Sequence, residues 1–312
     1  MLLTDADVRA AISPRQAIAL IAEAFRDLYP QAIVPERVHL EIPGRGVMLF
    51  MPCCVPPLNA LGFKAALILD RAVAAGESVQ GTYFLLDAAT GSVRATLDAR
   101  HLTALRTAAT SAVATQLLAR PDAKSLGIFG AGRLARAHAE LIREVRPIAD
   151  VLVCGTSENK SRRFADDLTR SLNLPARAAS PEQCATADIV CTCTNAREPL
   201  LRGTWLRPGA HLNLVGAFRP DTREVDADAV IRSSVFVDTY DGALAEAGDL
   251  LIPLHAALIG RHHLLADLHT LLNGRHPGRR SPDEITLFKS VGHALEDLVL
   301  ADAVAKAVSR AR

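Results

Sequence analysis

The chain has 312 residues, 49% of them hydrophobic, and a formal net charge of +1. This length accommodates two ordinary domains, and the composition is that of a compact globular protein rather than a disordered one. The balanced charge argues against nucleic-acid binding, and no run approaches the roughly 18 apolar residues of a membrane span. Because Asp5 and Asp7 stand where a signal peptide would carry basic residues, we expect a cytoplasmic protein.

The first hundred residues combine two predicted helices with a strand-rich segment. Thr4 caps a predicted helix that ends near Ala11, and Ser13-Pro14 starts a second helix over residues 15–28. Short apolar runs separated by proline and glycine then predict strands at residues 47–51, 62–69, 81–86 and 92–97. Residues 87–91 have the composition of a hairpin loop. We therefore expect a half-buried mixed sheet that serves substrate binding or dimerisation.

The central segment alternates strands with helices. A closely packed helix is predicted over residues 102–118. Predicted strands follow at residues 126–129, 151–154, 189–192, 212–215 and 235–238. This alternation predicts a parallel sheet with helices on both faces, and ligands that bind beyond the carboxyl ends of its strands. Residues 260–282 are predicted to form a surface loop with a short helix, and residues 285–308 a final helix.

Residues 126–135, which read LGIFGAGRLA, are typical of a strand that enters a helix through a dinucleotide-binding turn. In such a turn Gly130 permits the tight bend, Gly132 lets the backbone approach a pyrophosphate, and Ala135 allows the helix to pack closely on the strand. The free N–H groups at the helix start would hold the phosphates. The second predicted strand completes the required order, so we expect a nicotinamide cofactor.

The six cysteines include no C-x-x-C pair and lie mostly in apolar, strand-like runs. This predicts buried free thiols. Cys191 and Cys193 would share one face of a strand, but no second pair or histidine cluster completes a tetrahedral metal site. We expect no metal.

Several motifs together resemble those of the ornithine cyclodeaminase/mu-crystallin family. The motifs are LTALRTAA at 102–109, GAG at 130–132, DAATG at 87–91, RPGAHLN at 207–213 and FKSVG at 288–292. The resemblance covers nearly the whole chain. It implies an α/β protein with a Rossmann NAD(P)-binding domain, residues 119–284, and an α+β substrate-binding and dimerisation domain, residues 1–118 and 285–312. It also implies a homodimer that acts on small imino or amino acids.

The resemblance assigns the substrate site to four side chains. Arg37 and Arg106 match positions that hold the substrate carboxylate, for which a guanidinium supplies paired donors. Lys64 matches a lysine that contacts substrate, and burial beside two arginines would lower its pKa enough for proton delivery. Thr82 matches a hydroxyl position in the same pocket. Without the resemblance, the two arginines are typical of surface residues. Lys64 also fits a lysine that faces solvent from a half-exposed strand, and Thr82 fits an ordinary strand threonine.

On the cofactor side the resemblance implies a second set of contacts. Besides Gly130 and Gly132, these are Thr107 near phosphate, Arg133 and Leu134 at the helix start, Thr156, Thr194 near ribose or nicotinamide, and Val215 and Val291 beside the nicotinamide ring. After Cys154 the chain reads GTSENK, with no acid at the first positions to accept the 2′-hydroxyl of NAD. This favours NADP, although Glu158 keeps NAD possible.

One departure from the family bears on the reaction. Ornithine cyclodeaminases carry an aspartate in a Val-Gly-Gly-Asp stretch, and the matching position here is Phe218, which cannot act as a base. Asp221, three residues later, is better interpreted as a turn residue. The Arg-Pro-Asp stretch that ends at Asp221 is typical of the mu-crystallin-like branch of the family. This branch is associated with the reduction of cyclic ketimines. We therefore expect an NAD(P)H-dependent ketimine reductase that forms proline or pipecolate. The alternatives are an ornithine cyclodeaminase with bound NAD, a dehydrogenase acting on an open-chain amino acid such as alanine, and a non-catalytic NADP(H)-binding protein.

Overall fold

The computed structural model describes residues 1–69 and 79–311, which divide into two compact units. The first unit comprises Met1–Arg106 and His293–Arg312, and the second comprises Thr107–Gly292. One dividing point lies inside helix α3 (Ala99–Leu118) and the other just before the last helix. Each unit contains one sheet.

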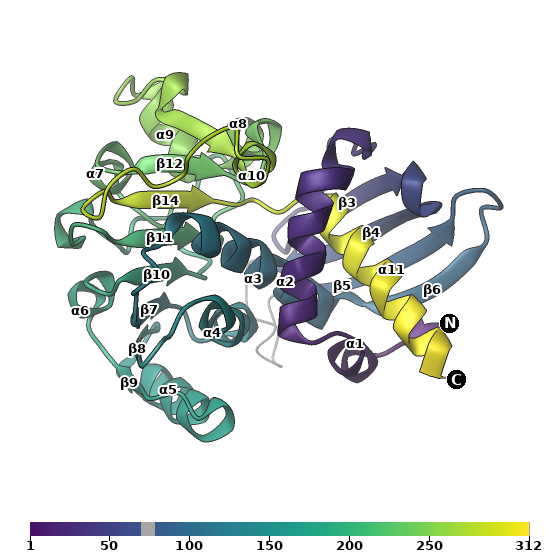
Figure 1. The fold of residues 1–312 in the computed structure, drawn as a ribbon, viewed down its shortest axis with the longest axis horizontal. Coiled ribbons are helices and arrows are strands. Elements are labelled where there is room, and N and C mark those ends of the chain that lie inside the picture. Colours follow the sequence, from purple (N-terminus) through teal and green to yellow (C-terminus); the bar gives the residue numbers. More distant parts are fainter. Residues whose placement is uncertain (70–78, 312) are drawn as a thin grey trace. The chain divides into compact units, whose positions relative to one another are not determined.

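The first unit is built on a six-stranded sheet in the order β1-β6-β5-β4-β3-β2. All neighbouring strands are antiparallel except β1, which runs parallel to β6, so the predicted mixed sheet is confirmed. The strands are β1 (Leu2–Leu3), β2 (Val38–Ile42), β3 (Gly46–Val55), β4 (Ala60–Leu69), β5 (Val79–Asp87) and β6 (Val93–Asp98). Helix α11 (Ala294–Ala311) crosses β3 to β6 on one face of this sheet (Figure 1).

The two N-terminal helices form where their capping signals predict. Thr4 and Asp7 form a capping box at the start of α1 (Asp5–Ala11), and Ser13 and Gln16 form another at the start of α2 (Pro14–Glu23). Such caps each stabilise a helix by about 0.5–2 kcal/mol because they satisfy orphan backbone N–H groups. Helix α2 continues as one π-helical turn, Ala24–Leu28, and both helices pack against α11.

The second unit is an eight-stranded sheet in the order β13-β12-β14-β11-β10-β7-β8-β9, and all its paired strands are parallel. The strands are β7 (Ser125–Phe129), β8 (Asp150–Cys154), β9 (Ala176–Ala178), β10 (Ile189–Thr192), β11 (His211–Leu214), β12 (Ser234–Val237), β13 (Leu264–Asp267) and β14 (Thr286–Lys289). The chain order reverses at β7, which lies between β8 and β10. In a doubly wound sheet such a reversal opens a ligand crevice at the carboxyl ends of the strands.

Helices of the second unit pack against both sides of this sheet. Helices α4 and α6 contact β7, and Figure 1 shows them on opposite sides of it. The helices that follow α3 are α4 (Arg133–Val145), α5 (Glu158–Leu172), α6 (Pro181–Ala185), α7 (Ala227–Ile231), α8 (Tyr240–Glu246), α9 (Gly248–His255) and α10 (Leu268–Leu272). Short 3-10 turns occur at Tyr29–Gln31, Pro56–Leu58, Gly203–Trp205 and Arg261–His263. The unit is a Rossmann-type α/β fold.

The structure corrects two predictions near the C-terminal end. Residues 286–289 form strand β14 between β11 and β12, whereas a helix was predicted from residue 285. Short apolar runs of this kind fit a buried strand as well as a helix. Strand β13 likewise replaces part of the loop predicted over residues 260–282. The two compact units divide at residues 106 and 292, whereas the domains predicted from the resemblance divide at 118 and 284. Among the residues that the structure describes, no helix is long and apolar enough to cross a membrane.

Candidate active site

A buried ion pair lies beneath α11 in the first unit. Lys64, in the middle of β4, is only 2% exposed. Its Nζ donates to both carboxylate oxygens of Asp297, at 2.8 Å to Oδ2 and 3.1 Å to Oδ1. An unpaired ammonium at this depth would cost several kcal/mol, so the carboxylate is what makes burial of Lys64 possible. The structure thus excludes the interpretation of Lys64 as an outward-facing lysine.

Arg106 joins the same cluster from α3. Its Nη1 donates to Glu296 Oε2 at 2.9 Å, and its Nε lies 3.4 Å from Asp297 Oδ1. Glu296 also accepts the backbone N–H of His293 at 3.1 Å, as a residue in the first turn of α11 can. The start of α11 therefore supplies two buried carboxylates to two buried cations. Neither Glu296 nor Asp297 was singled out from the sequence.

A third cation lies near this cluster. Arg37, half-buried just before β2, is close enough to influence Lys64. Burial, and then the charges of Arg106 and Arg37, lower the pKa of Lys64 to about 8, while Asp297 opposes this shift. The cluster thus combines a titratable proton donor, Lys64, with guanidinium groups of the kind that bind a carboxylate.

Thr82 does not belong to this cluster, contrary to the sequence-based assignment. In the register of β4 with β5, Lys64 pairs with Tyr83, and Thr82 pairs with Ala65. Because directly paired residues share a face and successive residues alternate, the Thr82 side chain lies on the face opposite Lys64. The resemblance to the family placed Thr82 correctly on a strand but could not fix its face.

In the second unit the turn after β7 has the geometry expected for a pyrophosphate site. Gly130 has φ of +118°, and a Cβ there would lie 2.6 Å from the Cys193 carbonyl oxygen. Gly132 caps α4 without any side-chain hydrogen bond, and a Cβ built on it meets no atom within 4 Å. Ala135 is fully buried. The backbone at Gly132 therefore leaves room for a phosphate at the start of α4, as a dinucleotide site requires.

The end of β8 is polar and exposed. The Gly155 N–H donates to Ser161 Oγ at 2.8 Å, and Thr156 beside it is exposed. Glu158 forms an ion pair with Arg162 one helical turn later. Glu158, the acid that leaves NAD possible as the cofactor, thus pairs with the guanidinium of Arg162.

Apart from Thr107, which lies inside α3, the remaining predicted cofactor residues occupy a helix start and strand ends of the second unit. Thr107 is buried in α3, and Arg133 and Leu134 are the first two residues of α4. Val215 follows β11, and the N–H of Val291, after β14, donates to Asp238 Oδ2 at 2.9 Å. Thr194 follows β10 and is bound through both its N–H and its hydroxyl to Glu224 Oε1, each at 2.8 Å. Glu224 is a further residue that the sequence did not reveal.

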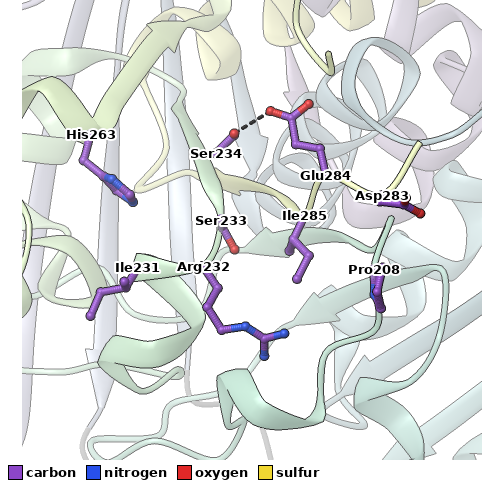
Figure 2. A pocket seen from close by; sticks show the side chains of 9 residues that line it. All are labelled: Pro208, Ile231, Arg232, Ser233, Ser234, His263, Asp283, Glu284 and Ile285. Carbon is purple, nitrogen blue, oxygen red and sulfur yellow. Dashed lines mark hydrogen bonds between the residues drawn. The ribbon is translucent and has the colours of Figure 1, made fainter. Parts of the chain in front are cut away.

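A cavity of about 520 Å³ lies at the other, amino end of this sheet (Figure 2). Its lining includes Ser234 at the start of β12 and Glu284 and Ile285 just before β14. Ser234 Oγ donates to Glu284 Oε1, and His263 Nε2 is bound to the Val230 carbonyl. The cavity therefore lies at the opposite end of the sheet from Val215 and Val291, which follow the carboxyl ends of β11 and β14.

Comparison with known proteins identifies the family of this chain. The profile of the ornithine cyclodeaminase/mu-crystallin family matches residues 1–311. The chain belongs to this family. A Delta(1)-pyrroline-2-carboxylate reductase of Bacillus cereus is 35% identical over 299 residues, which cover 94% of this chain and 92% of the relative. The ketimine reductase mu-crystallin of Mus musculus is 34% identical over 276 residues, which cover 88% and 83% of the two chains.

A solved structure of this family superposes over the whole chain. Thermococcus litoralis Delta(1)-pyrroline-2-carboxylate reductase, determined in complex with NADH and L-proline, has a TM-score of 0.97 and 35% identity. The match covers 100% of this chain and 98% of that one.

Phe218, which the resemblance matches to the aspartate of the deaminases, lies after β11. Its half-buried ring packs against the hydrophobic core of the second unit. Asp221 lies in an exposed turn. Phe218 therefore contributes to packing and supplies no acid or base, and the placement of Asp221 agrees with a turn role.

Proposed function

We propose that this protein is an NAD(P)H-dependent reductase of small cyclic ketimine carboxylates. The substrates would be Δ1-pyrroline-2-carboxylate or Δ1-piperideine-2-carboxylate, reduced to proline or pipecolate. The observation that carries the proposal is the buried cluster of Lys64, Arg106, Glu296 and Asp297, in which a lysine with a lowered pKa lies near a guanidinium that two carboxylates hold in place. The names of the Bacillus, mouse and Thermococcus relatives support the same reaction.

Arg37 and Arg106 are the residues proposed to bind the substrate carboxylate. A guanidinium offers paired N–H donors that match the two oxygens of a carboxylate. Arg106 is held by Glu296, which fixes the guanidinium before substrate arrives. Such fixed donors orient the substrate without an entropic cost at the moment of reaction.

Lys64 is the proposed acid. Reduction of a C=N bond requires a proton on the nitrogen, and a lysine whose pKa is about 8 is largely protonated at neutral pH yet gives up its proton readily. When bound, the reduced nicotinamide supplies the hydride for the imine carbon. The ammonium of Lys64 would donate the proton to the imine nitrogen, and the resulting amine would then be reprotonated from solvent.

The second unit is the proposed cofactor domain. Gly130, Gly132 and the start of α4 would hold the pyrophosphate, and Thr156 would lie beside the adenosine ribose. The exposed cations Lys160 and Arg163 near the end of β8 favour a 2′-phosphate, so we propose NADP as the preferred cofactor and NAD as the second.

The first unit is also the proposed dimer interface. The sheet face opposite α11 presents the half-exposed rings of Phe50, Phe63 and Phe84, of which Phe63 and Phe84 stack with centroids 4.9 Å apart. A contiguous apolar face of this kind marks a protein interface. We propose a homodimer.

The test is a substrate panel measured by oxidation of NADPH and of NADH at 340 nm. We expect turnover of both cyclic imine carboxylates and much weaker turnover of Δ1-pyrroline, which lacks the carboxylate. Purified protein that binds cofactor but oxidises it with neither carboxylate would refute the proposal. Ammonia release from ornithine without added cofactor would instead establish the cyclodeaminase.

A further inference from the structure

A buried carboxylate ties together two loops at the carboxyl end of the second sheet. Glu224 is fully buried. Its Oε1 accepts the N–H and the hydroxyl of Thr194, each at 2.8 Å, from the loop after β10. Its Oε2 accepts the Thr192 hydroxyl at 2.7 Å and the Gly216 N–H at 2.8 Å, the latter from the loop after β11. One side chain thus fixes both loops.

The negative charge of Glu224 belongs to a wholly buried triad with Asp249 and Lys289. Asp249 Oδ1 accepts the backbone N–H of Glu224 at 2.7 Å, and its Oδ2 accepts from Lys289 Nζ at 2.8 Å. Lys289 Nζ also donates to the Ala217 carbonyl at 2.6 Å, in the same loop as Gly216. The ammonium therefore compensates the carboxylates and holds the loop after β11 from a second side.

Gly216 has no room for a side chain because of this carboxylate. A Cβ there would lie 2.4 Å from Glu224 Oε1 and 2.1 Å from the Thr194 carbonyl oxygen. The glycine lets the two loops and the carboxylate meet at hydrogen-bonding distance. When buried polar groups all have hydrogen-bond partners, as they do around Glu224, they hold the backbone in a single rigid arrangement.

We propose that Glu224 is a positioning residue that fixes the loops after β10 and β11 for the nicotinamide end of the cofactor. In a doubly wound sheet the two halves of a dinucleotide lie on opposite sides of the reversal point. If the pyrophosphate lies at Gly132, the adenosine half of the cofactor lies beyond the carboxyl ends of β8 and β9. The nicotinamide half then lies beyond the carboxyl ends of β10 and β11. The inference rests on the proposed function for its cofactor.

The test compares two ligands that differ only in the nicotinamide. In Glu224→Gln, whichever oxygen becomes an amide nitrogen then faces a backbone N–H, of Thr194 or of Gly216. We expect the dissociation constant of NADH, from nicotinamide fluorescence, to rise about tenfold, which corresponds to about 1.4 kcal/mol. The dissociation constant of ADP-ribose, from calorimetry, should stay within about twofold. If the NADPH form binds better, NADPH and 2′-phospho-ADP-ribose replace the two ligands.

Two further variants make the result decisive. Glu284→Gln is the matched control, because the Glu284 carboxylate accepts a serine hydroxyl and backbone N–H groups at the amino end of the same sheet. This variant should leave both constants unchanged. If Glu224→Gln does not fold, Thr192→Val removes one donor to Oε2 and should weaken NADH alone about threefold. NADH affinity unchanged in the variant that folds, or equal weakening of both ligands, would overturn the inference. Wild-type protein that binds NADH but reduces neither imine overturns only the proposed function.

Discussion

Replacement of Asp297 by asparagine should move the alkaline limit of activity to lower pH. Asp297 contacts Lys64, with Oδ2 2.8 Å from Nζ, and favours its protonated form. A contacting opposite charge typically shifts a pKa by about one to three units, so its loss should lower the pKa of Lys64 from about 8 to between about 5 and 7. The Arg106 and Arg37 charges, which remain, act in the same direction.

The magnitude follows from the protonated fraction of Lys64. A proton donor must carry its proton, so kcat/KM falls as pH rises through the pKa of the free enzyme. With a pKa of about 8, roughly three quarters of the wild-type lysine is protonated at pH 7.5; with a pKa of about 6, roughly 3% is, which makes kcat/KM about 25-fold lower. At pH 5 the two proteins should differ much less.

The assay is the pH profile of kcat/KM for the preferred imine, between pH 5 and 10. The matched control is Asp302→Asn, since Asp302 is also a buried aspartate of α11 but pairs with Arg94 and Lys306. That variant should keep its alkaline limb near pH 8. An Asp297→Asn limb at or above the wild-type position would refute the assignment of Lys64 as the acid.

The same substitution has a consequence for stability. A lysine whose pKa is lower in the folded than in the unfolded state binds fewer protons when folded, so this group makes the free energy of unfolding rise with pH between the two values. The interval is about 8 to 10.5 for the wild type and extends further down for Asp297→Asn. Urea unfolding of Asp297→Asn and Asp302→Asn at pH 6 and 9 measures this difference.

Further substitutions test the proposed acid, the proposed pyrophosphate site and the proposed dimer interface. Lys64→Met should lower kcat at least about 100-fold with the dissociation constant of NADH unchanged, whereas Lys306→Met, on exposed α11 surface, should keep full activity. Gly132→Ala should keep its melting temperature within about 1 °C but bind cofactor poorly, because the added methyl group fills open space, whereas Gly130→Ala should melt lower, since φ of +118° strains an alanine. Phe63→Glu should convert the proposed dimer to a monomer in light scattering; an unchanged mass would contradict the proposed interface.

Features that depend on neighbouring residues in the sequence were predictable. Thr4 and Ser13 cap their helices through residues three positions later, and Gly130 and Gly132 lie in one turn between a strand and a helix. These signals act over a few residues and need no knowledge of packing. The same is true of the alternating strands and helices from β7 to β12.

Features that depend on distant residues were not predictable. Lys64 meets Asp297 across 233 positions, and nothing local marks Asp297, among the charged residues of α11, as its partner. The sheet face on which the Thr82 side chain lies could be predicted only from the register of β4 with β5, because the register decides the face of every side chain. Strand β14 is specified by its neighbours β11 and β12, since its four apolar-rich residues fit either a strand or a helix.

The most direct test follows the transferred hydrogen. The protein is incubated with Δ1-pyrroline-2-carboxylate and NADPH or NADH that carries deuterium at C4 on the transferred side, and the product is examined by NMR and mass spectrometry. The account predicts L-proline with one deuterium at Cα, formed in proportion to the cofactor oxidised. Oxidised cofactor without deuterated proline, or no oxidation by a protein that binds the cofactor, would contradict it.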